Sequence, residues 1–235
     1  MRILIVGAGS EIAENIVKYH VDNKDDVSII DHPSNKNKLM IDTESVSKYF
    51  LDVNNYSEVN NFFDSLDKFF EKLYFLVGTN IFKDVFSVTN NDWDYVMDTN
   101  LKSFFFFSQF FAKKLIDSKK GGNIVCIGSQ HGVVANGLRA PYCTSKGGLI
   151  HLTKVLALEY SIYNILVNCV SPTYMLTEKS KEFLNNSNVK KEFLTKIPLK
   201  KYVSPEEVAD CCIFLNNSSS ITGHNLIIDG GYSIW

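Results

Sequence analysis

The chain has 235 residues, of which 45% are hydrophobic and 21% are charged, and its formal net charge is −2. These values are typical of a folded globular protein and exclude a disordered or fibrous chain. A near-neutral charge with no basic half argues against a nucleic-acid-binding protein. The apolar runs are far shorter than the roughly 20 residues needed to span a bilayer, and the N-terminus is typical of a strand, not of a signal peptide. We therefore expect a cytoplasmic protein without membrane association.

Apolar runs typical of strands alternate with helical patterns along the whole chain. The predicted strands are Ile3–Val6, Val27–Ile30, Lys48–Leu51, Tyr74–Val77, Asn123–Ile127, Leu166–Val170 and Leu226–Ile228. The helical patterns lie near residues 11–23, 56–72, 92–118, 142–163 and 205–215. Strands that are apolar almost throughout, separated by helix-length stretches, indicate a parallel sheet covered on both faces. We predict a single α/β domain over residues 1–235, with a doubly wound (Rossmann) seven-stranded parallel sheet.

Glycine residues follow the first predicted strand directly. Gly7 and Gly9 match the first two glycines of a G-x-G-x-x-G loop, Ser10 follows them, and Ile12 stands at the third glycine position. A glycine turn that leads into a helix can bind a pyrophosphate on backbone N–H groups, with help from the helix dipole. These four residues are therefore candidate cofactor contacts, and a plain strand–helix turn is the alternative.

An acidic residue, Asp31, ends the second predicted strand about 20 residues beyond the glycines. A carboxylate at this position can accept hydrogen bonds from the hydroxyls of an adenosine ribose and would repel a 2′-phosphate. NAD is therefore the favoured cofactor and NADP the less favoured one. The alternative is that Asp31 only caps the turn that follows.

Tyr142 and Lys146 form a Tyr-x-x-x-Lys pair, which on a helix places both side chains on one face, one turn apart. An ammonium group so close favours the ionised phenol, so Tyr142 can exchange a proton with a substrate oxygen. Ser129, directly after the fifth predicted strand, can hydrogen-bond the same oxygen. The spacing alone is weak evidence, and the position of the pair at the carboxyl end of a strand strengthens it.

Neither the cysteines nor the histidines have the spacing of a metal site. The five cysteines are odd in number, scattered and without a C-x-x-C motif, so we expect buried, reduced thiols. The five histidines also lack metal-ligand spacing. No metal ion is predicted.

Over essentially its whole length the sequence resembles the single-domain members of the short-chain dehydrogenase/reductase family. The stretches that carry the resemblance, beside the residues above, are Leu51–Val53, Trp93–Asp94, Asn100–Leu101, Ile124–Ser129, Tyr142–Gly148, Leu156–Tyr160, Val167–Pro172, Pro198–Lys200, Ser204–Ala209, Ile221–Gly223 and Asp229–Gly231. The number and order of these matches, including twelve residues between Ser129 and Tyr142, make a chance resemblance improbable.

The resemblance implies catalytic roles for four residues. Ser129 positions the carbonyl or hydroxyl, and Tyr142 is the general acid/base. Lys146 binds the nicotinamide ribose and favours ionisation of the tyrosine. Asn100 kinks its helix and anchors a water that relays protons from Lys146.

The resemblance also implies further cofactor contacts. Asp52 and Val53 flank the adenine. The segment from Ile165 to Thr177, which includes Pro172, runs beside the nicotinamide, with Thr177 near the carboxamide. The implied activity is hydride transfer between a nicotinamide cofactor, NAD in preference to NADP, and a secondary alcohol or ketone.

The sequence departs from the family pattern around the cofactor. Glu11 and Ala13 replace glycines, and the Glu11 carboxylate is unfavourable beside a pyrophosphate unless its side chain turns to solvent. Val77–Asn80 replaces an Asn-Asn-Ala-Gly stretch, Thr173 replaces a glycine, and the segment between Asp31 and Lys48 suggests a shortened helix. These departures support an alternative function, a cofactor-poor binding or regulatory module without turnover. A carbon–carbon double-bond reductase is the enzymatic alternative, but such members usually space the tyrosine and lysine further apart.

The substrate side is less defined. His131, Asn136 and Arg139 lie in the loop between Ser129 and Tyr142, which the resemblance places at the pocket mouth. They weakly favour a polar or anionic substrate, such as a sugar or hydroxy acid, and the alternative is a surface arginine in a solvated loop. Residues from about 174 to 200 resemble the family's mobile substrate lid.

The helix predicted at 92–118 carries six phenylalanines between positions 104 and 111, more than a single core-facing stripe requires. The aromatic C-terminus, Tyr232–Trp235, is also unlike a free tail. We expect a homotetramer, or else a homodimer, paired through these surfaces as in the family. The alternative is that both patches pack inside one subunit.

Overall fold

A parallel sheet of seven strands forms the centre of the protein, in a computed structural model that describes residues 1–37, 39, 41 and 45–234. The strands are β1 (Arg2–Val6), β2 (Asp26–Asp31), β3 (Val46–Phe50), β4 (Lys72–Phe75), β5 (Gly122–Ile127), β6 (Ile165–Pro172) and β7 (Asn225–Ile228). Their order across the sheet is β3-β2-β1-β4-β5-β6-β7, and all neighbouring strands are parallel. This confirms the predicted doubly wound sheet.

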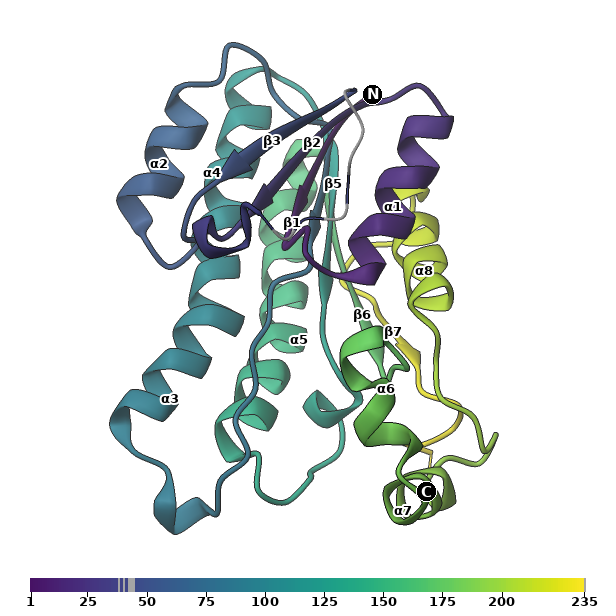
Figure 1. Ribbon diagram of the computed structural model, residues 1–235. Helices are drawn as coiled ribbons and strands as arrows, with labels where there is room; N and C mark the ends of the chain where they lie inside the picture. The colour runs from purple at the N-terminus through teal and green to yellow at the C-terminus, as the bar shows by residue number, and fades with distance from the viewer. Residues whose placement is uncertain (38, 40, 42–44, 235) are drawn as a thin grey trace.

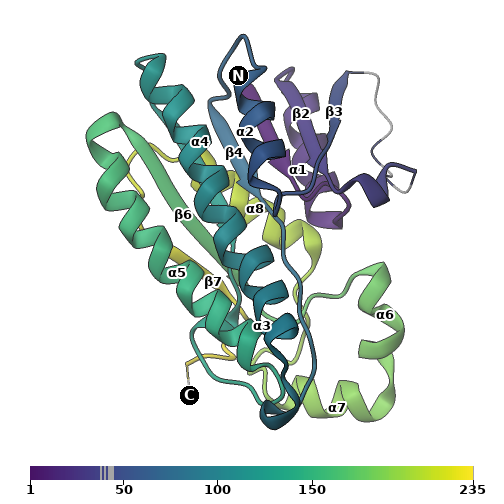
Figure 2. The ribbon, with the colours of Figure 1, turned by 90° about the vertical axis from the view of Figure 1, so that its left-hand side faces the viewer.

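Helices cover the sheet on both faces (Figures 1 and 2). The α-helices are α1 (Glu11–Asp22), α2 (Tyr56–Asp64), α3 (Asn90–Met97), α4 (Ser103–Asp117), α5 (Ala140–Tyr160), α6 (Glu178–Asn185), α7 (Ser187–Thr195) and α8 (Pro205–Asn217). A π-helical turn at Asp98–Lys102 joins α3 to α4, and short 3₁₀ turns lie at Pro33–Asn35, Val85–Ser87, Gln130–Gly132 and Ser161–Tyr163. Helices α1 and α8 pack on one face, and α2, α4 and α5 pack on the other.

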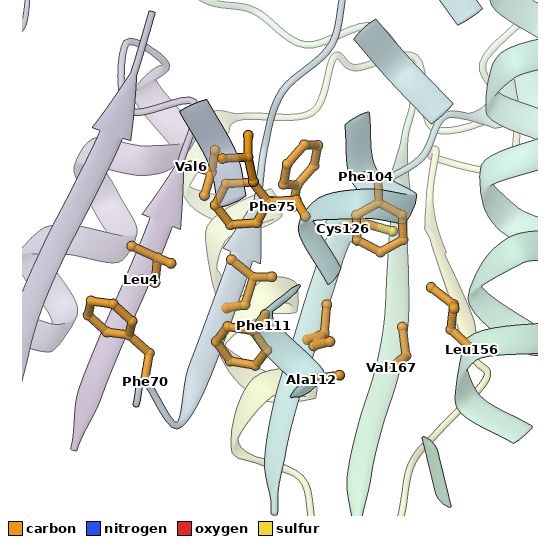
Figure 3. Close-up of a cluster of buried hydrophobic side chains, with 14 of the residues drawn as sticks. Leu4, Val6, Phe70, Phe75, Phe104, Phe111, Ala112, Cys126, Leu156 and Val167 are labelled. Atoms are coloured by element: carbon orange, nitrogen blue, oxygen red, sulfur yellow. The ribbon is translucent and has the colours of Figure 1, made fainter. Parts of the chain in front are cut away.

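The first strand shows why the strands are apolar throughout. Leu4 and Val6 point into the core shared with α2, α4 and α5 (Figure 3), whereas Ile3 and Ile5 point into the core beneath α1 and α8. All four side chains are completely buried. Because successive side chains of a strand point to opposite faces, a strand covered on both faces needs an apolar residue at every position.

Two of the predicted helices differ from the observed ones. The pattern at 56–72 is helical only to Asp64, and the residues beyond it lead as a loop into β4, with Phe70 buried in the core. The pattern at 92–118 is not one continuous helix, because the π-helical turn divides it. A chain of apolar residues at helical spacing does not reveal either break.

The phenylalanine-rich helix α4 packs mostly inside the chain. Phe104, Phe107 and Phe111 are completely or almost completely buried, and the other three phenylalanines are partly buried. Tyr56 at the start of α2 covers two of these, with ring centres 5.1 Å from Phe106 and 5.2 Å from Phe110. The alternative of packing inside one subunit therefore holds for Phe104, Phe107 and Phe111, and Tyr56 covers only part of the predicted apolar outer face.

Parts of two predictions lie outside the described residues. These are Trp235 at the C-terminus and several positions of the segment between Asp31 and Lys48, of which the described part contains a single 3₁₀ turn. Within the described part of the chain, none of the helices has the length and apolar character needed to cross a bilayer.

The order of the strands reverses between β1 and β4. β1 pairs with β2 on one side and with β4 on the other, so the connections after β1 and β4 run in opposite directions. In doubly wound sheets a ligand-binding crevice forms at this point, beyond the carboxyl ends of the strands.

Candidate functional site

The segment Gly7–Ser10, here called the glycine loop, leaves β1 in a conformation that only glycine adopts readily. Gly7 has a φ of +88°, and a Cβ atom at this residue would lie 3.1 Å from the backbone of Leu76 and Val77. Ser10 caps α1, because its Oγ accepts a hydrogen bond of 3.2 Å from the backbone N–H of Ala13. The other N–H groups in the first turn of a helix have no partner within the helix. The loop therefore directs an anion-binding helix end toward the crevice.

Asp31 ties the end of β2 to the glycine loop. Its carboxylate is buried, with 7% of the residue exposed. One carboxylate oxygen accepts a hydrogen bond from the N–H of Gly9, and the other accepts from the N–H of His32 at 2.6 Å and from the side-chain amide of Asn35 at 2.9 Å. The carboxylate is thus held in place at the rim of the crevice.

A cavity of about 540 Å³ lies at this point of the sheet. Six of the predicted cofactor contacts line it: Gly7, Gly9, Ser10, Asp31, Asp52 and Val53. Ile12 does not, because its side chain packs into the core beneath α1 and α8. Residues of the lining that the sequence did not suggest include Asn35, Tyr95 and Thr99.

Asn100 lies in the π-helical turn and is completely buried. Its Oδ1 accepts a hydrogen bond of 2.7 Å from the N–H of Thr79, and its Nδ2 donates to the carbonyl of Thr79 at 2.9 Å and to the Oγ of Ser145 at 3.0 Å. The side chain thereby joins the segment after β4 to α5. The expected kink at Asn100 is present as this π-helical turn.

Ser129, Tyr142 and Lys146 lie where β5 ends and α5 begins. The Lys146 ammonium, 2% exposed as a residue, donates a hydrogen bond of 2.7 Å to the carbonyl of Ile127 and lies 5.9 Å from the centre of the Tyr142 ring. Ser129 is also buried, and its Oγ accepts a hydrogen bond of 3.1 Å from the N–H of His131. The fold therefore brings the predicted serine, tyrosine and lysine to the same end of the sheet.

The residues predicted at the pocket mouth gather around the aromatic ring of Tyr174. The ring of His131 lies 5.7 Å from that of Tyr174 and 6.5 Å from that of Tyr142. Asn136 donates to His131 Nε2 at 3.2 Å and to the Tyr174 hydroxyl at 3.4 Å. Burial, together with the positive charges of Arg139 and Lys196, lowers the pKa of His131 to about 4. This imidazole is therefore neutral at neutral pH.

The predicted lid contains two helices, α6 and α7, which the sequence did not reveal; they lie beyond the carboxyl ends of the strands in Figure 1. Pro172 ends β6, and Thr177 caps α6 by accepting a hydrogen bond of 3.1 Å from the N–H of Ser180. The Glu11 carboxylate accepts a hydrogen bond of 2.8 Å from the N–H of Glu178. The side chain of Glu11 thus turns toward the lid, and its hydrogen bond joins the first turn of α1 to the first turn of α6.

All five cysteines are free thiols. Within the described part of the chain, no group of three His, Cys, Asp or Glu side chains is arranged to hold a metal ion.

A doubly wound sheet with a glycine loop, a strand-end carboxylate and a cavity between them is the arrangement of the nucleotide-binding α/β proteins. A family model described as enoyl-(acyl carrier protein) reductase matches residues 7–233. The chain belongs to the short-chain dehydrogenase/reductase family, as its motifs suggested.

Individual relatives have different activities. An NAD-dependent glycerol dehydrogenase of Listeria innocua is 43% identical over 144 residues, covering 60% of this chain and 56% of that protein. A 3-oxoacyl-[acyl-carrier-protein] reductase of Rickettsia prowazekii is 32% identical over 233 residues, covering 97% and 95%. A solved structure of a 4-hydroxyisoleucine dehydrogenase mutant complexed with NADH and succinate is similar with a TM-score of 0.93 and 30% identity, covering 100% of this chain and 99% of the other. The matches span little more than half the length of the first curated relatives, 52–56%.

Proposed function

We propose that the chain is an oxidoreductase that interconverts a secondary alcohol and a ketone with a nicotinamide cofactor. The observation that carries this proposal is the buried Lys146 ammonium, held on the carbonyl of Ile127 beside the Tyr142 ring. A buried ammonium next to a phenol is suited to proton exchange, and the cavity for a cofactor lies at the same edge of the sheet. The three relatives described above, two dehydrogenases and a reductase, support the proposal.

The residues around the cavity fit a dinucleotide. Its volume of about 540 Å³ lies within the usual range for ligand sites. The glycine loop would hold the pyrophosphate at the N-terminus of α1, Asp31 would accept from the adenosine ribose, and Asp52 and Val53 would flank the adenine. Pro172 and Thr177 would lie beside the nicotinamide. When bound, such a cofactor accepts or supplies a hydride.

The Asp31 carboxylate favours NAD over NADP, because it lies on the cavity wall and would repel a 2′-phosphate. Thermal unfolding with each cofactor tests this preference. A ligand at 100 times its Kd adds about 2.7 kcal/mol to stability, which raises the melting temperature measurably. We expect a larger shift with NAD or NADH, and a shift with NADP or NADPH alone would contradict the role of Asp31.

The chain's own residues handle the proton in this reaction. Ser129 would hydrogen-bond the reacting oxygen, and the Tyr142 hydroxyl would give or take its proton. Lys146 would stabilise the phenolate and bind the nicotinamide ribose. Asn100 fixes the backbone of Thr79 against α5, and it would anchor the water that relays protons from Lys146.

Replacement of the proposed acid/base tests the mechanism. Tyr142→Phe removes only the hydroxyl, so turnover should fall at least a hundredfold while NADH binding persists. Tyr160→Phe makes the same change at the other end of α5 and should leave turnover unchanged. Near-normal turnover by Tyr142→Phe would contradict the mechanism.

Substrates should be small and polar, such as sugars or hydroxy acids, and residues 174–200 should form the lid over them. Activity is to be measured with polyols, sugar acids and hydroxy amino acids, and also with a 2-enoyl thioester, which tests the double-bond reductase alternative. A chain that shows neither turnover nor a thermal shift with any nicotinamide cofactor would instead be the cofactor-poor binding module.

We also propose a cytoplasmic homotetramer, or else a homodimer. The exposed apolar side chains that support it lie at the end of α5 and just beyond it, where Leu158 is 76% exposed and Ile162 is 79% exposed. At the C-terminus, the aromatic ring of Tyr232 packs on His131, with ring centres 6.0 Å apart, whereas the aliphatic Ile234 is 80% exposed. Light scattering should report about four times 26.6 kDa, and a monomer peak would contradict the assembly.

A further inference from the structure

Arg139, at the start of α5, is a buried cation with no acidic partner. The residue is 8% exposed, and within the described part of the chain its guanidinium makes neither a hydrogen bond nor an ion pair. The other arginine, Arg2, pairs with Asp26 at 2.9 Å and donates to the carbonyl of Phe69. Buried arginines are almost always paired, because an unpaired buried charge is unfavourable.

Aromatic rings hold the guanidinium in place without satisfying its donors. Its Cζ lies 4.0 Å from the centre of the Phe82 ring and 6.0 Å from that of the Tyr174 ring. A ring beneath a guanidinium covers one face of the group. The N–H donors lie in the plane of the group, so stacking leaves them free for an acceptor.

A second unpartnered donor lies close to the same ring. Asn136 donates an amide N–H to His131 Nε2, so this nitrogen is an acceptor and the proton of the neutral imidazole is on Nδ1. The Nδ1 atom is buried and has no hydrogen-bond partner among the described residues. His131 is 4% exposed, and its ring packs on Tyr174, which also lies under Arg139.

Both groups are close to the proposed acid/base. Arg139 precedes Tyr142 by three residues at the start of the same helix, and the His131 ring lies 6.5 Å from the Tyr142 ring. For a substrate whose alcohol carbon lies at Tyr142, these two donors are the candidates for binding another of its groups. The surroundings of His131 are positively charged. The charges of Arg139 and Lys196 both lower its pKa.

We propose that the substrate carries a carboxylate, which Arg139 binds through its guanidinium and His131 binds through its Nδ1–H. This inference rests on the proposed function, and it selects hydroxy acids and keto acids over neutral polyols. A planar carboxylate matches the paired donors of a guanidinium, and it supplies the acidic partner that the Arg139 guanidinium lacks among the described residues.

Calorimetric titration of succinate, a dicarboxylate without an oxidisable alcohol, tests the proposal independently of turnover. The titration is made with the chain alone and with its NADH complex, so a failure to bind NADH does not prevent the measurement. The unaltered chain should bind succinate and should not bind the neutral succinamide. Arg139→Gln should weaken succinate binding at least tenfold, and Arg139→Lys should weaken it less.

Two variants serve as controls. Lys83→Gln also removes a positive charge near this loop, but Lys83 already pairs with Asp92 at 2.7 Å, so succinate binding should not change. Tyr142→Phe should retain succinate binding while losing turnover, which separates the carboxylate site from the catalytic mechanism. Melting temperatures of all variants confirm that each is folded.

Two results would overturn the proposal: no binding of succinate by the unaltered chain at millimolar concentration, or equal binding by the unaltered chain and a folded Arg139→Gln. In either case Tyr142→Phe still tests the proposed oxidoreductase activity separately.

Discussion

Replacement of Asn100 by alanine should destabilise the protein by about 4–6 kcal/mol. The substitution removes three hydrogen bonds, two with the backbone of Thr79 and one with the Oγ of Ser145. Each contributes about 1 kcal/mol, and an N–H group left without an acceptor costs about 1–3 kcal/mol more. The side chain is completely buried, so water does not readily replace these partners. This loss is a large part of the 5–15 kcal/mol typical of a folded domain.

Urea unfolding followed by circular dichroism, at one fixed protein concentration, measures this loss. Asn55→Ala is the matched control, because Asn55 caps α2 at the surface and its removal should cost only about 1 kcal/mol. A loss below 1 kcal/mol for Asn100→Ala would refute the assignment of this side chain as the link between the β4 segment and α5.

Three further substitutions have distinct expected outcomes. Asp31→Asn should lower the preference for NAD over NADP at least tenfold, measured as the ratio of the two dissociation constants, because the carboxylate no longer repels a 2′-phosphate. Gly78→Ala should leave urea stability unchanged or slightly raised, yet lower kcat/KM several-fold, because its Cβ would lie 3.3 Å from the Lys146 Nζ. The pKa of His131 is about 4 in the folded state and 6.5 when unperturbed, so its contribution to stability is complete above pH 6.5 and is lost as the pH falls toward 4. His131→Gln should flatten the decline of the melting temperature over this range, and His20, whose pKa burial also lowers, should account for the remaining slope.

The sheet and the positions of Ser129, Tyr142 and Lys146 at one end of it were predictable because their signals are local. A strand that is covered on both faces is apolar at every position, as Ile3–Val6 shows, so a short continuous apolar run is enough to identify it. Ser129, Tyr142 and Lys146 depend only on a strand end and on the spacing along one helix. Their meeting at one edge then follows from the parallel sheet.

What the sequence did not reveal depends on contacts between distant segments. Ile12 stands at a position of the glycine-loop motif, but its side chain packs into the core beneath α1 and α8. No local pattern in the sequence indicates this packing. In the sequence, nothing indicates which residues cover the phenylalanines of α4. In the structure Tyr56, which is distant along the chain, covers two of them. The same holds for Glu11, whose hydrogen-bond partner is 167 residues away. Helices α6 and α7 are only eight and nine residues long and carry few apolar residues each, so their patterns are too short to distinguish from a polar loop.

The π-helical turn at Asp98–Lys102 has a consequence for insertions and deletions. Such a turn is an α-helix with one surplus residue, and each residue of an α-helix rotates the next by about 100°. Deletion of a single codon here would restore a regular helix, with the sheet and both cores intact. It would also swing the amide of Asn100 away from Thr79. We therefore expect a variant with this single-residue deletion to fold and to keep the cavity, but to lose the hydrogen bonds between the Asn100 amide and Thr79.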